Sequence, residues 1–285
     1  MSETLAALLA PARLTEVVDI GANPHGSDPP YKAMLAAGAC RVTGFEPQAD
    51  ALEKLRAAAG PNERYLPHAV GDGGAHTLHL CRSPGMASLL APDAATLEVF
   101  GALKHWGEVT GSVPVQTRRL DDIDEIERLD FLKMDVQGSE LAVLRHGGRK
   151  LAQAVAAQVE VSFVTLYEGQ PPFGEVDLEF RRQGFIPHCF AEVKNWPIAP
   201  CVVDGDPYKP LRQLLEADIV YVRDFTRPDA MDDEQLKHLA LVAHHGFGSI
   251  DLVMRCLMLL ARRGAVPADA GQRYARIAAS RPAAA

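Results

Sequence analysis

The sequence lacks several patterns that would assign a chain to a class at once. Its 285 residues contain no C-x-x-C pair, no G-x-G-x-x-G fingerprint and no cluster of Lys and Arg. Five widely spaced cysteines argue for reduced thiols and against a disulfide framework. With 29 basic against 37 acidic side chains, the net charge is -8 and no basic face is available for nucleic acid. We therefore expect no nucleic-acid partner.

Long hydrophobic runs are also missing. The N-terminal residues have neither the basic start nor the apolar stretch of a signal peptide. The most apolar stretch, 252–261, contains Arg255 and is too short to cross a bilayer. We therefore expect a cytoplasmic protein without a membrane partner.

What the chain does contain is an alternation of short apolar runs and helix-like segments. Pro30 and Gly38 bracket the first of these helical segments, as is typical of helix starts and ends. Strands that alternate with helices predict a doubly wound, Rossmann-like α/β fold with a largely parallel sheet. The runs expected to form strands are 15–21, 40–46, 64–70, 129–135, 155–163, 185–190 and 217–225, with a hairpin-like segment at 75–81 and a further strand at 113–119 in an irregular region.

Beyond residue 228 the pattern is helical only. We expect one α/β domain over 1–228 and a two-helix extension, a helical hairpin, over 229–285. Each helix carries one apolar stripe, represented by Leu236 in the first and Leu257 in the second. Such stripes must pack on the α/β domain or on a second copy of the chain, and we favour a homodimer because two-fold dimers are common.

Three strand ends carry residues suited to a nucleoside ligand. Asp19 and Gly21 close the first strand, and a carboxylate there suits a ligand with a cationic end better than a pyrophosphate. S-adenosylmethionine (SAM) has such an end. Glu46 closes the second strand, where an acid accepts from ribose hydroxyls, and the turn at 68–73 is placed to wall the adenine. The residues expected to bind SAM are Asp19, Gly21, Ala22, Asn23, Glu46, Pro47, Ala69, Val70, Gly71, Asp72 and Asp135.

Five segments resemble, in order, the motifs of FkbM-type methyltransferases. They are VVDIGAN, GFEP, AVGDG, TRRLDDI and FLKMDVQGSELAVLRHG, within residues 15–225. The resemblance implies a class I SAM-dependent enzyme with a seven-stranded sheet whose last strand, 217–225, is inserted antiparallel. It also implies O-methylation of a hydroxyl on a sugar, a polyketide or another small metabolite, without fixing which.

One departure from the family bears on metal binding. The family's D-x-E-G-x-E reads Asp135-Val136-Gln137-Gly138-Ser139-Glu140, so an amide stands where the family has a carboxylate. Since Mg²⁺ prefers anionic oxygen ligands, we expect no metal at this position.

Several side chains could serve as the base that accepts the hydroxyl proton. We favour Asp135 at the end of its strand, and Glu160, His188 and His25 remain alternatives. Asp28-Pro29-Pro30-Tyr31 matches the D-P-P-Y motif of amino-group methyltransferases, but here it follows the glycine loop and opens a helix. We therefore interpret it as a helix start.

Two other functions are compatible with this fold class. A nicotinamide-dependent oxidoreductase would use the same kind of sheet, but the single-glycine loop at Gly21 argues against it. A non-catalytic scaffold would bind the cofactor or nothing, yet it need not keep three nucleoside strand ends.

Overall fold

The computed structural model of the chain describes residues 3–23 and 28–279. Its centre is a seven-stranded sheet in the order β3-β2-β1-β7-β8-β10-β9. β10 runs antiparallel to both of its neighbours, and the other pairs are parallel. The bounds are β1 Thr15–Ile20, β2 Cys40–Phe45, β3 Glu63–Leu66, β7 Phe131–Met134, β8 Ala156–Ser162, β9 Phe185–Trp196 and β10 Gln213–Arg223. The doubly wound α/β fold with an inserted antiparallel last strand is confirmed.

A second, three-stranded sheet lies beside the carboxyl ends of these strands. Its order is β4-β6-β5, with β4 Ala69–Gly71, β5 Ala75–Cys81 and β6 Val109–Arg119. The single strand expected over 64–70 is therefore wrong, because the chain leaves the large sheet after Leu66 and pairs with β6 from Ala69 onward. Pro67 lies at the break, and a proline cannot donate to a sheet ladder.

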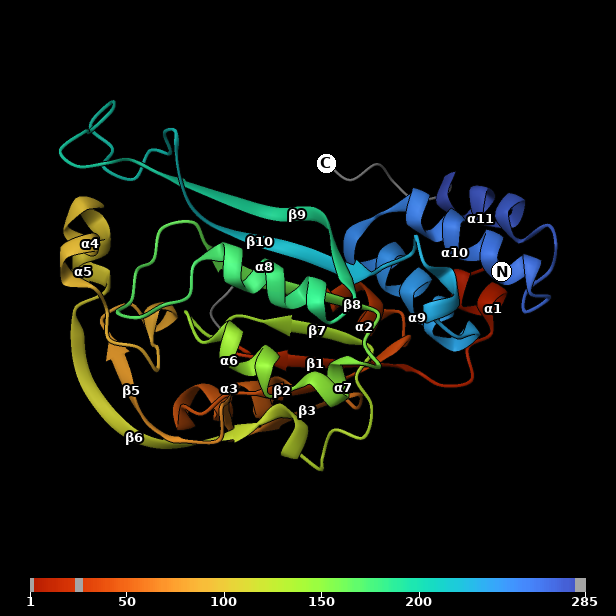
Figure 1. Cartoon of the computed structure of the whole chain (residues 1–285), viewed down its shortest axis with the longest axis horizontal. Coiled ribbons are helices and arrows are strands. Elements are labelled where there is room, and N and C mark those ends of the chain that lie inside the picture. The colour runs from red at the N-terminus through yellow and green to blue at the C-terminus, as the bar shows by residue number, and fades with distance from the viewer. Residues whose placement is uncertain (1–2, 24–27, 280–285) are drawn as a thin grey trace.

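Helices cover both faces of the large sheet (Figure 1). One face buries Val18, Leu132 and Val159 against α6 Glu140–Arg145, α7 Gly148–Leu151 and α8 Phe173–Arg182. The helices α2 Lys32–Ala36 and α3 Ala49–Ala58 follow β1 and β2 in sequence, and α4 Ala94–Val99 and α5 Ala102–Trp106 lie near the far end of β9 and β10. Successive side chains of each strand point to opposite faces of the sheet and therefore pack in two separate hydrophobic cores.

The C-terminal helices pack on the other face of the sheet at its amino end. Leu236, Leu239 and Leu257 share one hydrophobic core with Val17, Val220 and neighbouring strand residues. Where two helices were expected, the described part of this segment contains three helices and a π-helical turn. They are α9 Asp233–Val242, the turn Ala243–Phe247, α10 Ile250–Arg262 and α11 Ala270–Ala279.

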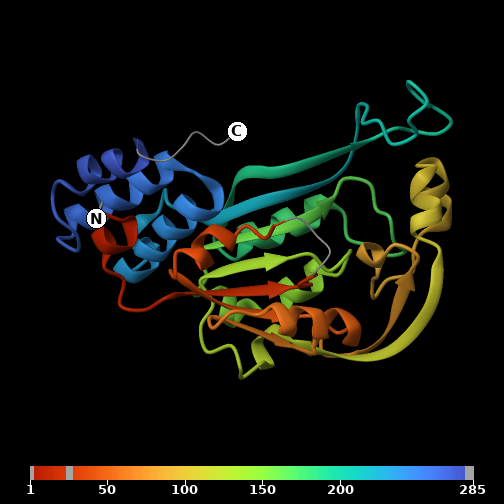
Figure 2. The same cartoon turned by 180° about the vertical axis from the view of Figure 1, so that it is seen from behind.

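The first and last described helices lie side by side in this helical layer. α1, Leu5–Leu9, lies beside α11 (Figure 2), and Arg273 forms an ion pair with Glu3. Because the stripe residues Leu236 and Leu257 are buried within one chain, no second copy is needed to cover them. No helix among the described residues is long and apolar enough to span a membrane.

β9 and β10 are longer than their sequence patterns predict. Both extend beyond the other strands toward α4 and α5 (Figure 1). We call this extension, with the connection 197–212 at its tip, the arm. The indole N–H of Trp196 donates to the Phe100 carbonyl at 3.2 Å, and the Trp106 and Tyr208 rings stack with centroids 5.3 Å apart. These contacts anchor the arm to the short helices beside it.

Candidate active site

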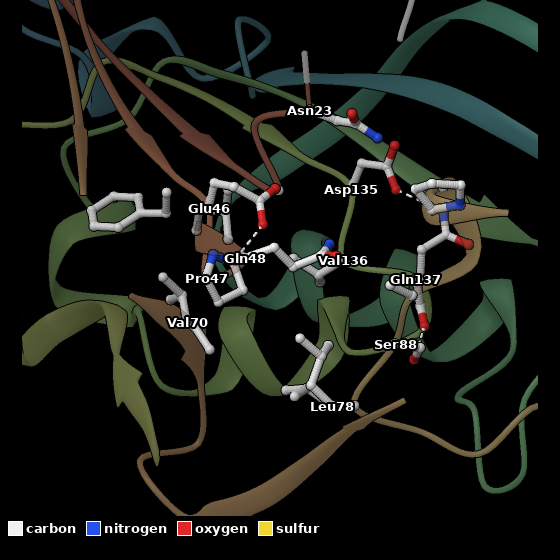
Figure 3. Close-up of a pocket in the computed structure, with 18 of the residues that line it drawn as sticks. Asn23, Glu46, Pro47, Gln48, Val70, Leu78, Ser88, Asp135, Val136 and Gln137 are labelled. Carbon is white, nitrogen blue, oxygen red and sulfur yellow. Dashed lines mark hydrogen bonds between the residues drawn. The ribbon is translucent and has the colours of Figure 1, made fainter. Parts of the chain in front are cut away.

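A cavity of about 540 Å³ opens at the carboxyl ends of β1, β2, β7 and β8. This is the edge at which doubly wound folds bind their ligands. Figure 3 shows Glu46, Pro47 and Val70 on one side of the cavity, and Ser88, Asp135 and Gln137 on the other. The two sides differ in chemistry.

The turn after β1 requires glycine. Gly21 has φ +82°, and a Cβ added there would lie 1.9 Å from the carbonyl oxygen of Asp135. The Asp135 N–H in turn donates to the Ile20 carbonyl at 3.0 Å. Any side chain at residue 21 would therefore push the β1 and β7 ends apart and deform the floor of the cavity.

Glu46 is the acid on the side of the cavity formed with Pro47 and Val70, which is the side expected to bind a nucleoside. It is buried, with a relative exposure of 5%, and its Oε1 accepts from the backbone N–H of Gln48 at 2.7 Å. Burial raises the pKa of Glu46, and the Gln48 N–H opposes this by stabilising the anion. The Gln48 side chain also stabilises the Glu46 carboxylate, which lines the cavity.

Apolar side chains surround the same side. Ala69, Val70 and Leu78 line the cavity from the small sheet, and Phe45 lies with its ring centroid 6.2 Å from that of His68. A flat heterocycle fits between such groups. Among the described residues that line this half, Glu46 is the one carboxylate.

The opposite side is a network of charged and amide groups. Gln137 Nε2 donates to Asp135 Oδ1 at 2.8 Å and to Glu160 Oε2 at 2.6 Å. Lys194 Nζ donates to Glu160 Oε1 at 2.6 Å and lies 3.7 Å from Glu216. Strand register explains the cluster, because Glu160 pairs with Asp218 and Glu216 pairs with Lys194 across β8, β10 and β9.

Burial sets the protonation of this network. It raises the pKa of Glu160 well above its usual range, with the charges of Asp135 and Glu216 adding to the effect and Lys194 opposing it. Burial likewise raises the pKa of Glu216 to about 6. Although burial opposes the Lys194 ammonium, the two glutamates raise its pKa above the usual lysine value. The ammonium therefore holds the buried carboxylates in place as a positive partner.

The family of the chain follows from its match to a known domain. The family described as the methyltransferase FkbM domain matches residues 19–187, more than half of the chain. The chain belongs to this family. The match includes the strand ends of Glu46, Asp135 and Glu160, and it ends inside β9.

Solved methyltransferase structures resemble this FkbM domain at a distance. Magnesium protoporphyrin IX methyltransferase from Synechocystis PCC 6803, with bound SAM, is 11% identical over 77% of this chain and 76% of its own, with a TM-score of 0.39. A putative methyltransferase from Thermoplasma acidophilum is 9% identical over 74% and 69%, with a TM-score of 0.38. At such scores the likeness carries no argument. Among curated proteins, no match is found.

Asp19 of the FkbM domain lies beneath the cavity and does not line it. Its side chain is buried, and its Oδ2 accepts from the Tyr31 hydroxyl at 2.6 Å. Its Oδ1 lies 3.5 Å from Lys133 Nζ, which also approaches the Gly21 carbonyl at 3.4 Å. Asp19 therefore reaches the glycine turn through Lys133. Tyr31, the last residue of the D-P-P-Y sequence, therefore orients the Asp19 carboxylate through this hydrogen bond.

The other predicted residues divide into three groups. Gly21, Asn23, Glu46, Pro47, Ala69, Val70, Asp135 and Glu160 line the cavity. Ala22, Gly71, Asp72 and His188 do not, and His25 lies outside the described residues. Asp72 instead caps a turn, where the Gly74 N–H and His76 lower its pKa to about 2. His188 lies 2.9 Å from the Ser249 hydroxyl, against the helical layer.

Sequence reasoning missed several residues of the site. The segment 83–89 closes one wall, and its Ser88 hydroxyl donates to the Gln137 carbonyl at 2.6 Å. Tyr167 donates to Gln137 Oε1 at 2.8 Å. No local pattern marks Ser88 or Tyr167. Lys194 was detectable in principle, since Glu192, Lys194 and Trp196 alternate as in a strand.

Proposed function

We propose that this FkbM domain is a SAM-dependent methyltransferase that methylates a hydroxyl group of a small polar molecule. The observation that carries the proposal is one cavity with Glu46 on one side and Asp135 on the other. When bound, SAM supplies an electrophilic methyl group on a sulfonium. Everything else required for the reaction is binding, orientation and removal of one proton.

The nucleoside half of the cavity suits the adenosine part of SAM. A carboxylate such as Glu46, at the end of the second strand, suits ribose hydroxyls, and Ala69, Val70 and Leu78 offer apolar contact to the base. The turn at Gly21 admits a ligand close to the backbone because it carries no side chain. The family membership supports the same assignment.

The acid half of the cavity suits removal of a hydroxyl proton. As the acceptor oxygen receives the methyl group that SAM would supply, Asp135 would take the proton that the hydroxyl loses. Asp135 lines the cavity and lies beside Asn23 (Figure 3). Polar groups at this end, including Lys194, favour an acceptor with several hydrogen-bonding groups. A sugar, a polyketide alcohol and another hydroxylated metabolite all meet this description.

The test combines binding with transfer. SAM binding is measured by calorimetry, and transfer of a labelled methyl group is measured across a panel of monosaccharides, hydroxy acids and macrolide alcohols. We expect one SAM per chain and O-methyl products. Asp72→Asn is the control, because Asp72 was predicted at the site but does not line the cavity. Absence of SAM binding by the folded protein would overturn the proposal.

A further inference from the structure

Gln137 is held in one orientation by the groups around it. Its Oε1 accepts from the hydroxyl of Tyr167, which is buried at 2% exposure and lies closer to this oxygen, at 2.8 Å, than to the Met86 carbonyl at 3.2 Å. Its carbonyl accepts from Ser88, and its backbone has φ +51°, a left-handed conformation that few non-glycine residues adopt. Turning the amide over would place Oε1 against two carboxylates. The NH2 group must therefore face Asp135 and Glu160.

The two carboxylates bound by this amide are not equivalent. Both oxygens of Glu160 are occupied, Oε2 by Gln137 and Oε1 by Lys194, and Glu160 is only 5% exposed. Asp135 has Oδ1 bound by Gln137, while no described residue hydrogen-bonds its Oδ2. Since Asp135 lines the cavity, it retains one oxygen for an incoming proton.

We propose that Gln137 is a positioning residue that fixes Asp135 as the base, with Glu160 as the anchor that holds the amide. This inference rests on the proposed function and resolves the choice between Asp135 and Glu160. Glu160 is already bound at both oxygens, so its part is to orient Gln137. Gln137 satisfies two adjacent carboxylates with two N–H groups and has no proton of its own to lose.

An amide is the side chain that this geometry demands. A glutamate at residue 137 would have the same shape, yet it would bring three carboxylates together and replace two donors by acceptors. Like charges at such distances favour retention of a proton within the group. Glu160 is also faced by the acids Glu216 and Asp218 and by Tyr167, while the cations Lys194 and Lys133 would offset part of the added charge.

The decisive variant is therefore Gln137→Glu, with Gln137→Met as a neutral variant that removes the two donors together with the oxygen that faces Tyr167. We expect kcat to fall about 100-fold or more in both. The acid limb of the kcat profile should move to higher pH by about one unit or more in Gln137→Glu only. The affinity for SAM should change by less than about threefold, because the adenosine half is untouched. Gln153→Glu, on an exposed glutamine, is the matched control.

A readout without any acceptor separates this inference from the proposed function. In protein labelled with ¹³C at glutamate carboxyls, with Glu160→Gln used to assign the signal, the pKa of Glu160 should rise further in Gln137→Glu. An unchanged Glu160 titration together with an unchanged kcat profile would overturn the positioning role. If the wild type binds no SAM, the proposed function fails, whereas a shifted Glu160 titration would still support the Gln137 geometry.

Discussion

The two halves of the cavity use opposite strategies. The nucleoside half has one carboxylate, Glu46, set among apolar walls and bound by a backbone N–H. The acid half has Asp135, Glu160, Gln137 and Lys194 in one hydrogen-bonded network. The first half needs only to bind a ligand of fixed shape. The second must hold charge in a buried place and still leave one oxygen reactive.

This difference predicts where substitutions act. Changes in the nucleoside half should alter the affinity for SAM and leave the pH dependence of the reaction alone. Changes in the acid half should alter turnover and the pH dependence of stability, with little effect on SAM affinity. The comparison fails if one substitution in either half produces both effects to the same degree.

The largest effect is expected from Asp135→Asn. The amide keeps an oxygen toward Gln137 but accepts no proton, so kcat should fall about 1000-fold, within the range of general-base catalysis. Single-turnover measurement of methyl transfer gives the rate, and calorimetry gives the SAM affinity, which should stay within about threefold. A larger loss in Glu160→Gln than in Asp135→Asn would reverse the roles assigned to the two carboxylates.

Lys194→Met should destabilise the acid half in a pH-dependent manner. The substitution removes the positive partner of Glu160 and Glu216 and leaves both buried carboxylates unpaired. Because Lys194 is 35% exposed, we expect the free energy of unfolding at pH 7 to fall by only about 2 kcal/mol. Burial raises the folded-state pKa of Glu216 from 4.5 to about 6 and that of Glu160 further. The difference from wild type should therefore be smallest below pH 4.5 and grow as pH rises through the folded-state values.

Urea unfolding at several pH values measures this difference. Lys209→Met is the control, because that lysine pairs with Asp204 on the exposed tip of the arm. Addition of Glu160→Gln to Lys194→Met should recover part of the loss by removing one stranded charge. A pH-independent loss would show that Lys194 contributes packing alone.

Glu46→Ala should weaken SAM binding by roughly 1–3 kcal/mol, or about 5- to 150-fold in Kd, through lost ribose hydrogen bonds. Calorimetry against Glu53→Ala, an exposed glutamate of α3, provides the comparison. At saturating SAM, kcat should change little. Undiminished SAM affinity would remove Glu46 from the site.

The cavity residues Gly21, Glu46, Asp135 and Glu160 could be predicted because each follows or ends a strand that is recognisable locally. The pattern is a strand followed by an acid or a glycine and then by a turn. It lies within a few consecutive residues, as at Gly21 and Glu46. The acid half depends on register between distant strands. Lys194 reaches Glu160 across β10, and Tyr167 reaches Gln137 from a loop 30 residues away. No single window of the sequence contains such a pair.

The same distinction explains the errors in the fold. The order of strands and helices followed from alternation, but the split between β3 and β4 and the length of β9 did not. The residues at which a strand begins and ends depend on the strand with which it pairs in the folded sheet. The helical layer was expected as an appended pair, yet its apolar residues complete a core that includes Val17 and Val220. Domain boundaries after residue 228 therefore remain a prediction from composition alone.

Tyr31→Phe should give the smallest effect, and it tests the boundary between the two halves. The Tyr31 hydroxyl donates to Asp19 at 2.6 Å beneath the glycine turn, while Lys133 remains as the second partner of Asp19. Loss of one donor to a buried carboxylate should cost about 1–2 kcal/mol of stability. SAM affinity and kcat should both change less than about threefold, because neither Tyr31 nor Asp19 lines the cavity. If D-P-P-Y instead gripped an amino acceptor, as the motif does in amino-group methyltransferases, kcat/KM would collapse while the melting temperature held. Thermal melts and transfer kinetics on one preparation therefore separate a tyrosine that supports Asp19 from one that touches the substrate.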